Sequence, residues 1–238
     1  MAPVRLGVVI PLANEGANVD DLLRRVAAQV GEGDRVFCVL DRVSRDDTRA
    51  RVEEFGARDG RFEVVWAPEN RSVVDAYFRG YREALDAECA WILEMDGGLS
   101  HLPEQIPQFV AAMEAGFDFA GGSRFAPGGR HAGSAARRAI SWGGTVLANR
   151  MLGTRMSDMT SGFECFRRDA LEHVIARGVR SRAHFFQTEI RWMMHRFRWT
   201  EIPIDYTCAS PSVGTSSLTD ALVSLRELRR RARAERAP

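Results

Sequence analysis

Polar and acidic side chains follow three apolar segments in the first half of the chain. Asn14 and Glu15 come directly after the first segment. Asp41 ends the second segment, and Asp96 ends the fourth. Such acids can hydrogen-bond a ribose or a base, or hold a divalent cation that neutralises a diphosphate. Each one alone could equally cap a helix or lie on the surface, so the indication of a nucleotide-sugar site comes from the set.

The segments that would carry these acids alternate between two patterns. Short apolar runs predict strands at residues 4–13, 35–41, 62–67, 90–96 and 117–122. Helical patterns separate them, beginning at a cap on Asn18, near Asp46, at a capping box of Ser72 and Asp75, and at Pro103. This alternation predicts a parallel sheet flanked by helices, in which the carboxyl ends of the strands share one edge.

The second half of the chain has a looser pattern. A glycine-rich loop at 126–133 precedes a helix through Trp142, and helices are expected near 169–177 and 185–197, with a strand at 200–206. No repeat or linker divides the chain, so we expect one α/β domain over residues 1–216. Residues 217–238 are expected to form a basic amphipathic helix packed on or beside it. Two interpretations of this helix stay open: a docked helix with a solvated end, or an interfacial helix attracted to anionic lipid.

The composition narrows the class of protein. The 238 residues have a formal net charge of only +1, and all 33 basic residues are arginine. This balance argues against a nucleic acid as partner. The four cysteines are far apart and form no C-x-x-C pair, which disfavours a zinc site and a disulfide framework and favours a reducing compartment.

The hydropathy pattern bears on localisation. No apolar run approaches the roughly 20 residues that cross a bilayer, and we expect no signal peptide. The expectation is therefore a cytoplasmic protein, with peripheral attachment to the inner face of a membrane, or to a membrane protein, left open.

Several motifs occur in an order that carries a resemblance. The runs are VVIPLANEGANVDDLL at 8–23, EMDGGLSHLPEQIP at 94–107, GGSRFAPGG at 121–129, RRAIS at 137–141 and DMTSGFECFRRDAL at 158–171. Together they resemble the family 2 glycosyltransferases with the GT-A fold, and within them the dolichol- and polyprenyl-phosphate mannosyltransferases. The resemblance implies a single-domain, mixed and mostly parallel sheet flanked by helices.

The resemblance also implies site residues. The nucleotide-sugar would be bound by Pro11, Leu12, Asn14, Glu15, Asp41, Arg42, Ser44, Asp46, Gly97 and Gly98. Asp96 would hold Mg²⁺ or Mn²⁺. The acceptor side would consist of Ser123, Arg124, Arg137, Arg138, Ser141, Asp158, Thr160, Ser161 and Gly162. The catalytic residues would be Asp96, Arg124, Gln187 and Glu189.

The implied reaction moves a hexose, with mannose from GDP-mannose preferred, to a polyprenyl phosphate. This acceptor is already an anion, so it can attack the anomeric carbon without a general base, and one in-line displacement inverts that centre. The enzyme must hold two anions that repel each other, which is work for positive charge. Two alternatives remain: the same fold with a UDP-sugar or a soluble acceptor, and an impaired, partner-binding pseudo-enzyme.

Three departures from the family pattern bear on these alternatives. Arg42 stands where the second acid of the strand-two motif is usual, which leaves the base of the donor open. Gly98 replaces the second carboxylate of the D-x-D motif, which predicts a weakened metal site. The late cationic motif is absent from residues 209–217, so the acceptor phosphate would depend on Arg124, Arg137 and Arg138. His101 is interpreted as a residue of the loop or of the ligand-binding surface.

Overall fold

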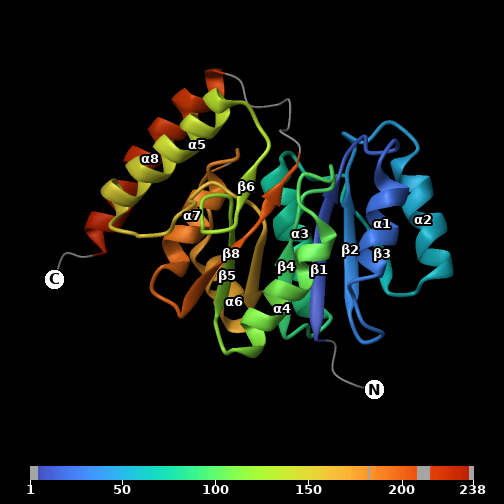
Figure 1. Cartoon of the computed structure of the whole chain (residues 1–238). Helices are drawn as coiled ribbons and strands as arrows, with labels where there is room; N and C mark the ends of the chain where they lie inside the picture. The colour runs from blue at the N-terminus through green and yellow to red at the C-terminus, as the bar shows by residue number, and fades with distance from the viewer. Residues whose placement is uncertain (1–4, 182, 208–214, 236–238) are drawn as a thin grey trace.

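A seven-stranded sheet forms the centre of the computed structural model, which describes residues 5–181, 183–207 and 215–235 (Figure 1). The strand order is β3-β2-β1-β4-β7-β5-β8. The strands are β1 (Leu6–Leu12), β2 (Arg35–Leu40), β3 (Phe62–Trp66), β4 (Trp91–Glu94), β5 (Phe119–Ser123), β7 (Glu164–Arg167) and β8 (Trp199–Pro203). Only β7 is antiparallel to its neighbours. The predicted α/β fold with a mixed, mostly parallel sheet is confirmed.

Helices cover both faces of this sheet (Figure 1). They are α1 (Val19–Ala27), α2 (Thr48–Arg58), α3 (Val73–Asp86), α4 (Ile106–Glu114), α5 (Ala135–Leu152), α6 (Arg168–Arg177), α7 (Phe186–Met194) and α8 (Thr215–Ala234). Successive side chains of a strand point to opposite faces. Accordingly, Val8 and Ile10 join a core with α1 and α4, whereas Val9 joins a second core with α3, α6 and α7. Burial on both faces explains why β1 and β2 are almost continuously apolar in sequence.

The helix starts test the expected caps. Ser72 caps α3, because its Oγ accepts a hydrogen bond from Asp75 N at 3.2 Å. Pro103 begins a short 3₁₀ turn, η1 (Pro103–Gln105), that leads into α4. The expected cap at Asn18 is wrong in one respect: Asn18 precedes α1, but its side chain makes no capping hydrogen bond.

The C-terminal helix packs against the domain. Leu225, Leu228 and Ala232 of α8 are buried and belong to the core that α3 and α7 share. Figure 1 shows α8 beside α5, at the end of the sheet away from β3.

In the glycine-rich loop, β6 (Arg130–His131) pairs with β9 (Asp205–Tyr206). The late motif at 209–217 lies mostly outside the described residues, and the side chain of Leu218 is likewise not described.

The contact of α3 with the sheet requires a glycine, and this makes a testable prediction. A Cβ on Gly80 would lie 2.3 Å from Val9 Cγ1 and 3.0 Å from Val39 Cγ2. We expect Gly80→Ala to lower the free energy of unfolding by about 1–3 kcal/mol, because overpacking displaces the helix. Gly143 of α5 has nothing within 4 Å of such a Cβ, so Gly143→Ala is the matched control. The control should gain up to about 1 kcal/mol in urea unfolding from helix propensity alone. Equal stability of the two variants would contradict the described packing of α3.

Candidate active site

Hydrogen bonds join the loops that follow β1 and β2. Asn14 has a φ of 58°, in the left-handed region that asparagine tolerates better than most residues. Its Nδ2 donates to Val43 O at 3.0 Å, and its Oδ1 accepts from Arg45 N at 2.9 Å. Its backbone N donates to Ser44 Oγ at 3.3 Å. Asn14 and Ser44 therefore fix the two loops to each other.

Asp46 completes this link. Its carboxylate accepts from Thr48 Oγ1 at 2.6 Å and from Gly16 N at 2.9 Å. These hydrogen bonds, that of Thr48 first, lower the pKa of Asp46 below its ordinary value. Both side chains thus hold the loops together, and the expectation that Ser44 and Asp46 contact the nucleotide stays a prediction.

The remaining donor-side residues divide into buried and accessible positions. Leu12 is only 3% exposed and its side chain lies in the core, and its expected contact with the nucleotide stays a prediction. A Cβ on Gly97 would lie 2.5 Å from Leu12 Cδ2 and 2.9 Å from Pro11 O, so only glycine lets this loop close over β1. Asp41 is half-buried and accepts from the backbone N of residue 43 at 2.8 Å, and Arg42 is exposed.

The Asp96 carboxylate is held from two sides. Oδ1 accepts from the Tyr77 hydroxyl at 2.9 Å, and Oδ2 accepts from Ser100 Oγ at 3.0 Å. The side chain remains 44% exposed. Asp96 is therefore an oriented carboxylate that still faces solvent, as a ligand-binding acid must.

His101 lies beneath Asp96. The ring is 1% exposed and stacks on Phe163 with a centroid distance of 4.9 Å. Burial lowers the pKa of His101, and the charge of Arg124 lowers it further against the opposing effect of Asp96. Its Nδ1 accepts from Asp96 N at 3.1 Å, so in the neutral ring the proton is assigned to Nε2, which lies 3.8 Å from Asp96 Oδ2.

A second carboxylate stands beside Asp96. A Cβ on Gly98 would lie 3.4 Å from Glu15 Oε1, so Glu15 occupies the space next to the missing acid of the D-x-D motif. Burial, followed by the charges of Asp46 and Asp96, raises the pKa of Glu15, although Asn18 donates a hydrogen bond that opposes this rise. Glu15 and Asp96 thus place oxygen ligands on adjacent strand ends.

On the acceptor side, Arg124 and Asp158 form a buried ion pair. Arg124 Nε donates to Asp158 Oδ2 at 2.7 Å, and its Nη2 donates to Asp158 Oδ1 at 3.0 Å and to Thr160 Oγ1 at 2.5 Å. The exposed fractions of the two residues are 8% and 0%. Burial alone would raise the pKa of Asp158, but Arg124 outweighs burial and holds that pKa below its ordinary value.

A second buried arginine braces the same loop. Arg191 of α7 donates from Nε to Glu164 Oε1 at 2.6 Å, from Nη2 to Gly122 O at 2.9 Å, and from Nη1 to Asp158 O. A Cβ on Gly121 would lie 2.9 Å from the Arg191 guanidinium, so glycine in β5 makes room for it.

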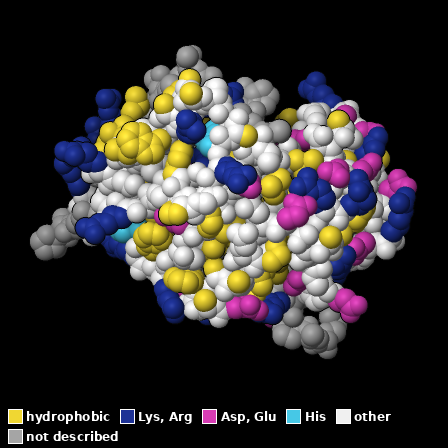
Figure 2. All heavy atoms as spheres, in the orientation of Figure 1, with side chains coloured by type: hydrophobic (Ala, Val, Ile, Leu, Met, Phe, Trp, Pro, Cys, Tyr) yellow, Lys and Arg dark blue, Asp and Glu magenta, His cyan; other side chains and the backbone are white. Residues whose placement is uncertain are grey.

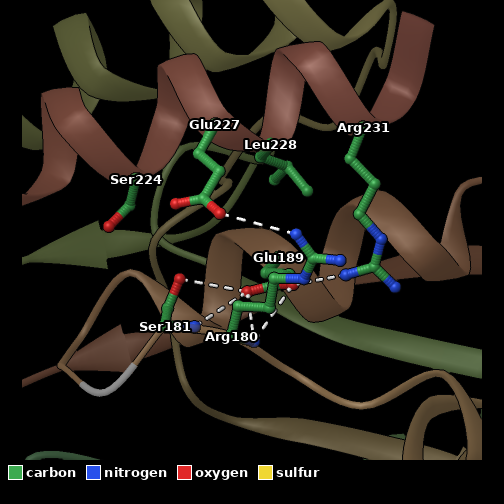
Figure 3. Close-up of a pocket in the computed structure, with 7 residues that line it drawn as sticks. All are labelled: Arg180, Ser181, Glu189, Ser224, Glu227, Leu228 and Arg231. Carbon is green, nitrogen blue, oxygen red and sulfur yellow. Dashed lines mark hydrogen bonds and ion pairs between the residues drawn. The ribbon is translucent and has the colours of Figure 1, made fainter. Parts of the chain in front are cut away.

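Gln187 and Glu189, expected together at the acceptor, point in different directions. Gln187 Nε2 lies 2.7 Å from the position that a Cβ on Gly162 would take, next to the loop that contains Asp158 and Thr160. Glu189 instead accepts from Ser181 Oγ at 3.0 Å and from Arg231 Nη1 of α8 at 2.9 Å (Figure 3). Residues i and i+2 of a helix are separated by about 200°. In this structure the Glu189 carboxylate ties α8 to residues 180 and 181, and its expected catalytic role stays a prediction.

The other acceptor-side expectations fall around α5. Ser134 caps this helix by accepting from Arg137 N at 3.3 Å, which places Arg137, Arg138 and Ser141 in its first turns. Burial lowers the pKa of His131 most, and the charges of Arg124 and Arg138 lower it further. Both guanidinium groups therefore act on the same side chain. Ser123 is buried and its Oγ accepts from Ala126 N at 2.9 Å. Ser123 therefore shapes the loop.

A row of rings connects the two halves of the site. Phe163 stacks on His101, and Tyr206 lies next, with centroids 5.8 Å from His101 and 5.5 Å from His131. The Arg124 guanidinium lies 5.3 Å from the Tyr206 ring centroid. Burial lowers the pKa of Arg124, but Asp158 first, and then Tyr206 and Asp96, raise it overall. Asp96 and Arg124 therefore belong to one electrostatic site.

Sequence reasoning missed two residues that hold the site. Tyr77 has no motif around it, and only its position on the buried face of α3 places it next to Asp96. Arg191 lies in the run QTEIRW at 187–192, outside the motifs that carry the resemblance. A helical arginine among apolar neighbours signals a buried ion pair, but not which partner it takes.

Comparison with known proteins gives the family. The model of the Glycosyl transferase family 2 matches residues 7–175. The undecaprenyl-phosphate mannosyltransferase of Micrococcus luteus is 30% identical, over 92% of this chain and 90% of that protein. The polyprenol monophosphomannose synthase of Mycolicibacterium smegmatis is also 30% identical, over 97% of this chain and 89% of its own length.

A solved structure supports the fold. The glucosyl-3-phosphoglycerate synthase of Mycobacterium tuberculosis, in a complex with Mn²⁺, UDP and glucosyl-3-phosphoglycerate, superposes with a TM-score of 0.70 at 16% identity. The likeness covers 95% of this chain and 80% of that one. The family match, the ordered motifs and the shared fold agree: the chain is a glycosyltransferase that belongs to family 2.

Proposed function

We propose that this glycosyltransferase moves a hexose, preferably mannose, from a nucleoside diphosphate sugar to a polyprenyl phosphate, with inversion. The observation that carries the proposal is the joining of Asp96 and Arg124 in one site through His101 and Tyr206. The Asp96 carboxylate suits a nucleotide-sugar donor with its cation, and the Arg124 guanidinium suits an anionic acceptor. The 30% identity to two enzymes named for polyprenyl-phosphate mannose transfer supports this choice of substrates.

The donor would bind at the ends of β1, β2 and β4. There Asp41 and Arg42 would lie near the base and ribose, and the hydrogen bonds between the loops would keep that edge in one shape. GDP-mannose is the preferred donor. Arg42 is the observation that favours a UDP-sugar as the alternative, since it changes the charge beside the base.

The residues present fit Mg²⁺ or Mn²⁺. Both ions prefer oxygen ligands, and Mg²⁺ commonly takes one or two carboxylates and completes its shell with phosphates and water. Asp96 and Glu15 would supply these carboxylates, with Glu15 in place of the acid missing at Gly98. The bound ion would neutralise the departing diphosphate. Tyr77 and Ser100 keep the Asp96 carboxylate aimed by their hydrogen bonds.

The acceptor phosphate would meet the other edge of the site. Nε and Nη2 of Arg124 are occupied by Asp158 and Thr160, whereas Nη1 donates no hydrogen bond within residues 5–181, 183–207 and 215–235. Arg124 would offer that Nη1, and Arg138 a second cation. The charge pair orients the guanidinium before the acceptor arrives, which lowers the cost of holding two anions in line.

The product assay tests the proposal as a whole. Incubation with labelled GDP-mannose and a short polyprenyl phosphate should give a labelled lipid whose anomeric configuration, read by NMR, is opposite to that of the donor. In thermal shift, GDP should stabilise the chain more than UDP or CDP. A labelled lipid from UDP-sugars alone would select the alternative donor. The absence of lipid product and of nucleotide stabilisation would favour a partner-binding pseudo-enzyme.

The role of Glu15 can be tested by compensation. Glu15→Gln should weaken Mn²⁺ binding, followed by EPR in the presence of GDP, by at least about tenfold, since it removes one of two carboxylates. Adding Gly98→Asp to that variant should restore most of the affinity. Glu53→Gln, an exposed helix position with the same change of charge, is the control. Unchanged Mn²⁺ affinity in Glu15→Gln would exclude Glu15 as a ligand.

The buried ion pair makes a prediction about stability. Asp158→Asn leaves Arg124 buried without its counter-charge, so we expect a loss of about 3–5 kcal/mol in the free energy of unfolding. In a double-mutant cycle with Arg124→Gln, the second substitution should cost much less once the first is present. Additive losses would show that the two side chains do not depend on each other.

A further inference from the structure

Exposed apolar side chains gather on two neighbouring helices. On α5 the exposed fractions are 47% for Ile140, 57% for Trp142 and 45% for Val146. On α8 they are 46% for Leu222 and 57% for Val223. Outside these helices, the large hydrophobic residues that are exposed in the described part of the chain are Val43, Trp66 and Val73, at 60%, 37% and 40%. We call the α5–α8 group, with Leu147, the apolar surface.

The apolar surface is not needed to pack the two helices. α5 turns Thr145, Ala148 and Leu152 toward the domain, and α8 turns a different set of side chains into the core. The first half of α5, residues 135–143, has no buried side chain at all. A contiguous apolar patch that the fold itself leaves uncovered marks an interaction site.

Arginines surround the apolar surface. α5 and α8 carry eight arginines and two acids, whereas the whole chain has a net charge of only +1. The rest of the chain is therefore net acidic. The exposed arginines are Arg138, Arg150, Arg226, Arg229, Arg230 and Arg233. Figure 2 shows basic and hydrophobic side chains together at the end of the molecule where α5 and α8 lie.

The helix α5, which carries part of the apolar surface, also contacts the loop that contains Asp158 and Thr160. Thr145 Oγ1 of α5 accepts from Met159 N at 3.0 Å, and Gly144 would place a Cβ 4.0 Å from Thr160 Cγ2. Thr160 in turn accepts from Arg124. One helix therefore carries the exposed apolar residues on its outer face and supports the cation of the site on its inner face.

We propose that the α5–α8 apolar surface docks on an anionic bilayer, with Trp142, Ile140 and Val223 at the acyl boundary and the arginines on lipid phosphates. Charge complementarity selects this occupant. A second copy of the chain would bring the same arginines against each other, which is repulsive. Apolar side chains and basic residues on adjacent helix faces are the combination that interfacial helices use. The lipid nature of the acceptor is the proposed function on which this inference rests.

The first measurement uses vesicles that contain no acceptor. The wild-type chain should sediment with vesicles of phosphatidylcholine and phosphatidylglycerol at low salt, much less at high salt, and weakly with phosphatidylcholine alone. Trp142 emission should shift to shorter wavelength on binding. Trp142→Phe should keep the affinity and lose most of that shift. No sedimentation of the wild-type chain at low salt would overturn the proposal.

Variants separate the two components of docking. Ile140→Ser with Trp142→Ser should weaken vesicle binding by at least about tenfold, as should neutralising Arg226, Arg229, Arg230 and Arg233 to Gln. Trp66→Ser and Arg58→Gln, an exposed tryptophan and an exposed arginine elsewhere, are matched controls and should bind as the wild type does. Equal binding by all variants would overturn the assigned surface.

An activity comparison separates this inference from the proposed function. With a short acceptor in detergent, the Ile140→Ser and Trp142→Ser variant should match the wild type. With a long acceptor in vesicles it should lose about as much activity as it loses in binding. Wild-type vesicle binding without any lipid product would contradict the proposed function and leave the docking surface standing. A concentration-dependent dimer that the same substitutions abolish would assign the surface to a second copy instead.

Discussion

The buried pair of Arg124 and Asp158 sets the arrangement of the acceptor side. Two charges that leave water together are stable only when their geometry and hydrogen bonds are nearly complete, and this pair meets the condition through Thr160. Arg191 holds the same loop from beneath, and Glu201 accepts from Ser157 N at 2.8 Å at its start. The Arg124 guanidinium is therefore fixed by the folded chain, before any substrate is present.

The donor side follows a different principle. Its loops are held by the hydrogen bonds of Asn14, Ser44 and Asp46, and the carboxylates of Glu15 and Asp96 remain partly exposed. Burial, and then the charges of Asp46 and Asp96, raise the pKa of Glu15 against an opposing hydrogen bond from Asn18. Such a pair of carboxylates gains most from a bound cation. At Gly98, where the second acid of the D-x-D motif is missing, the carboxylate of Glu15 lies close by, from the loop after β1.

The sequence predicted best those features that depend on a single helix or strand. Strand alternation, the Ser72 cap and the positions of Asp96 and Arg124 at strand ends follow from local pattern. Expectations that depend on a side chain's direction were less secure: Leu12 lies at a strand end but points into the core. Glu189 could have been separated from Gln187 by helix geometry alone. Tyr77 and the pairing partners of Arg191 required the packing of α3 and α7 on the sheet, which no local pattern contains.

The uneven distribution of arginines along the chain has a kinetic consequence. Because α5 and α8 hold an excess of positive charge and the remaining domain is net acidic, the molecule has a large electric dipole along its length. The field of an anionic surface exerts a torque on such a dipole within about one Debye length, roughly 8–10 Å at physiological salt. The chain would turn its arginine end toward that surface during approach, so that encounters become productive without a search over orientations.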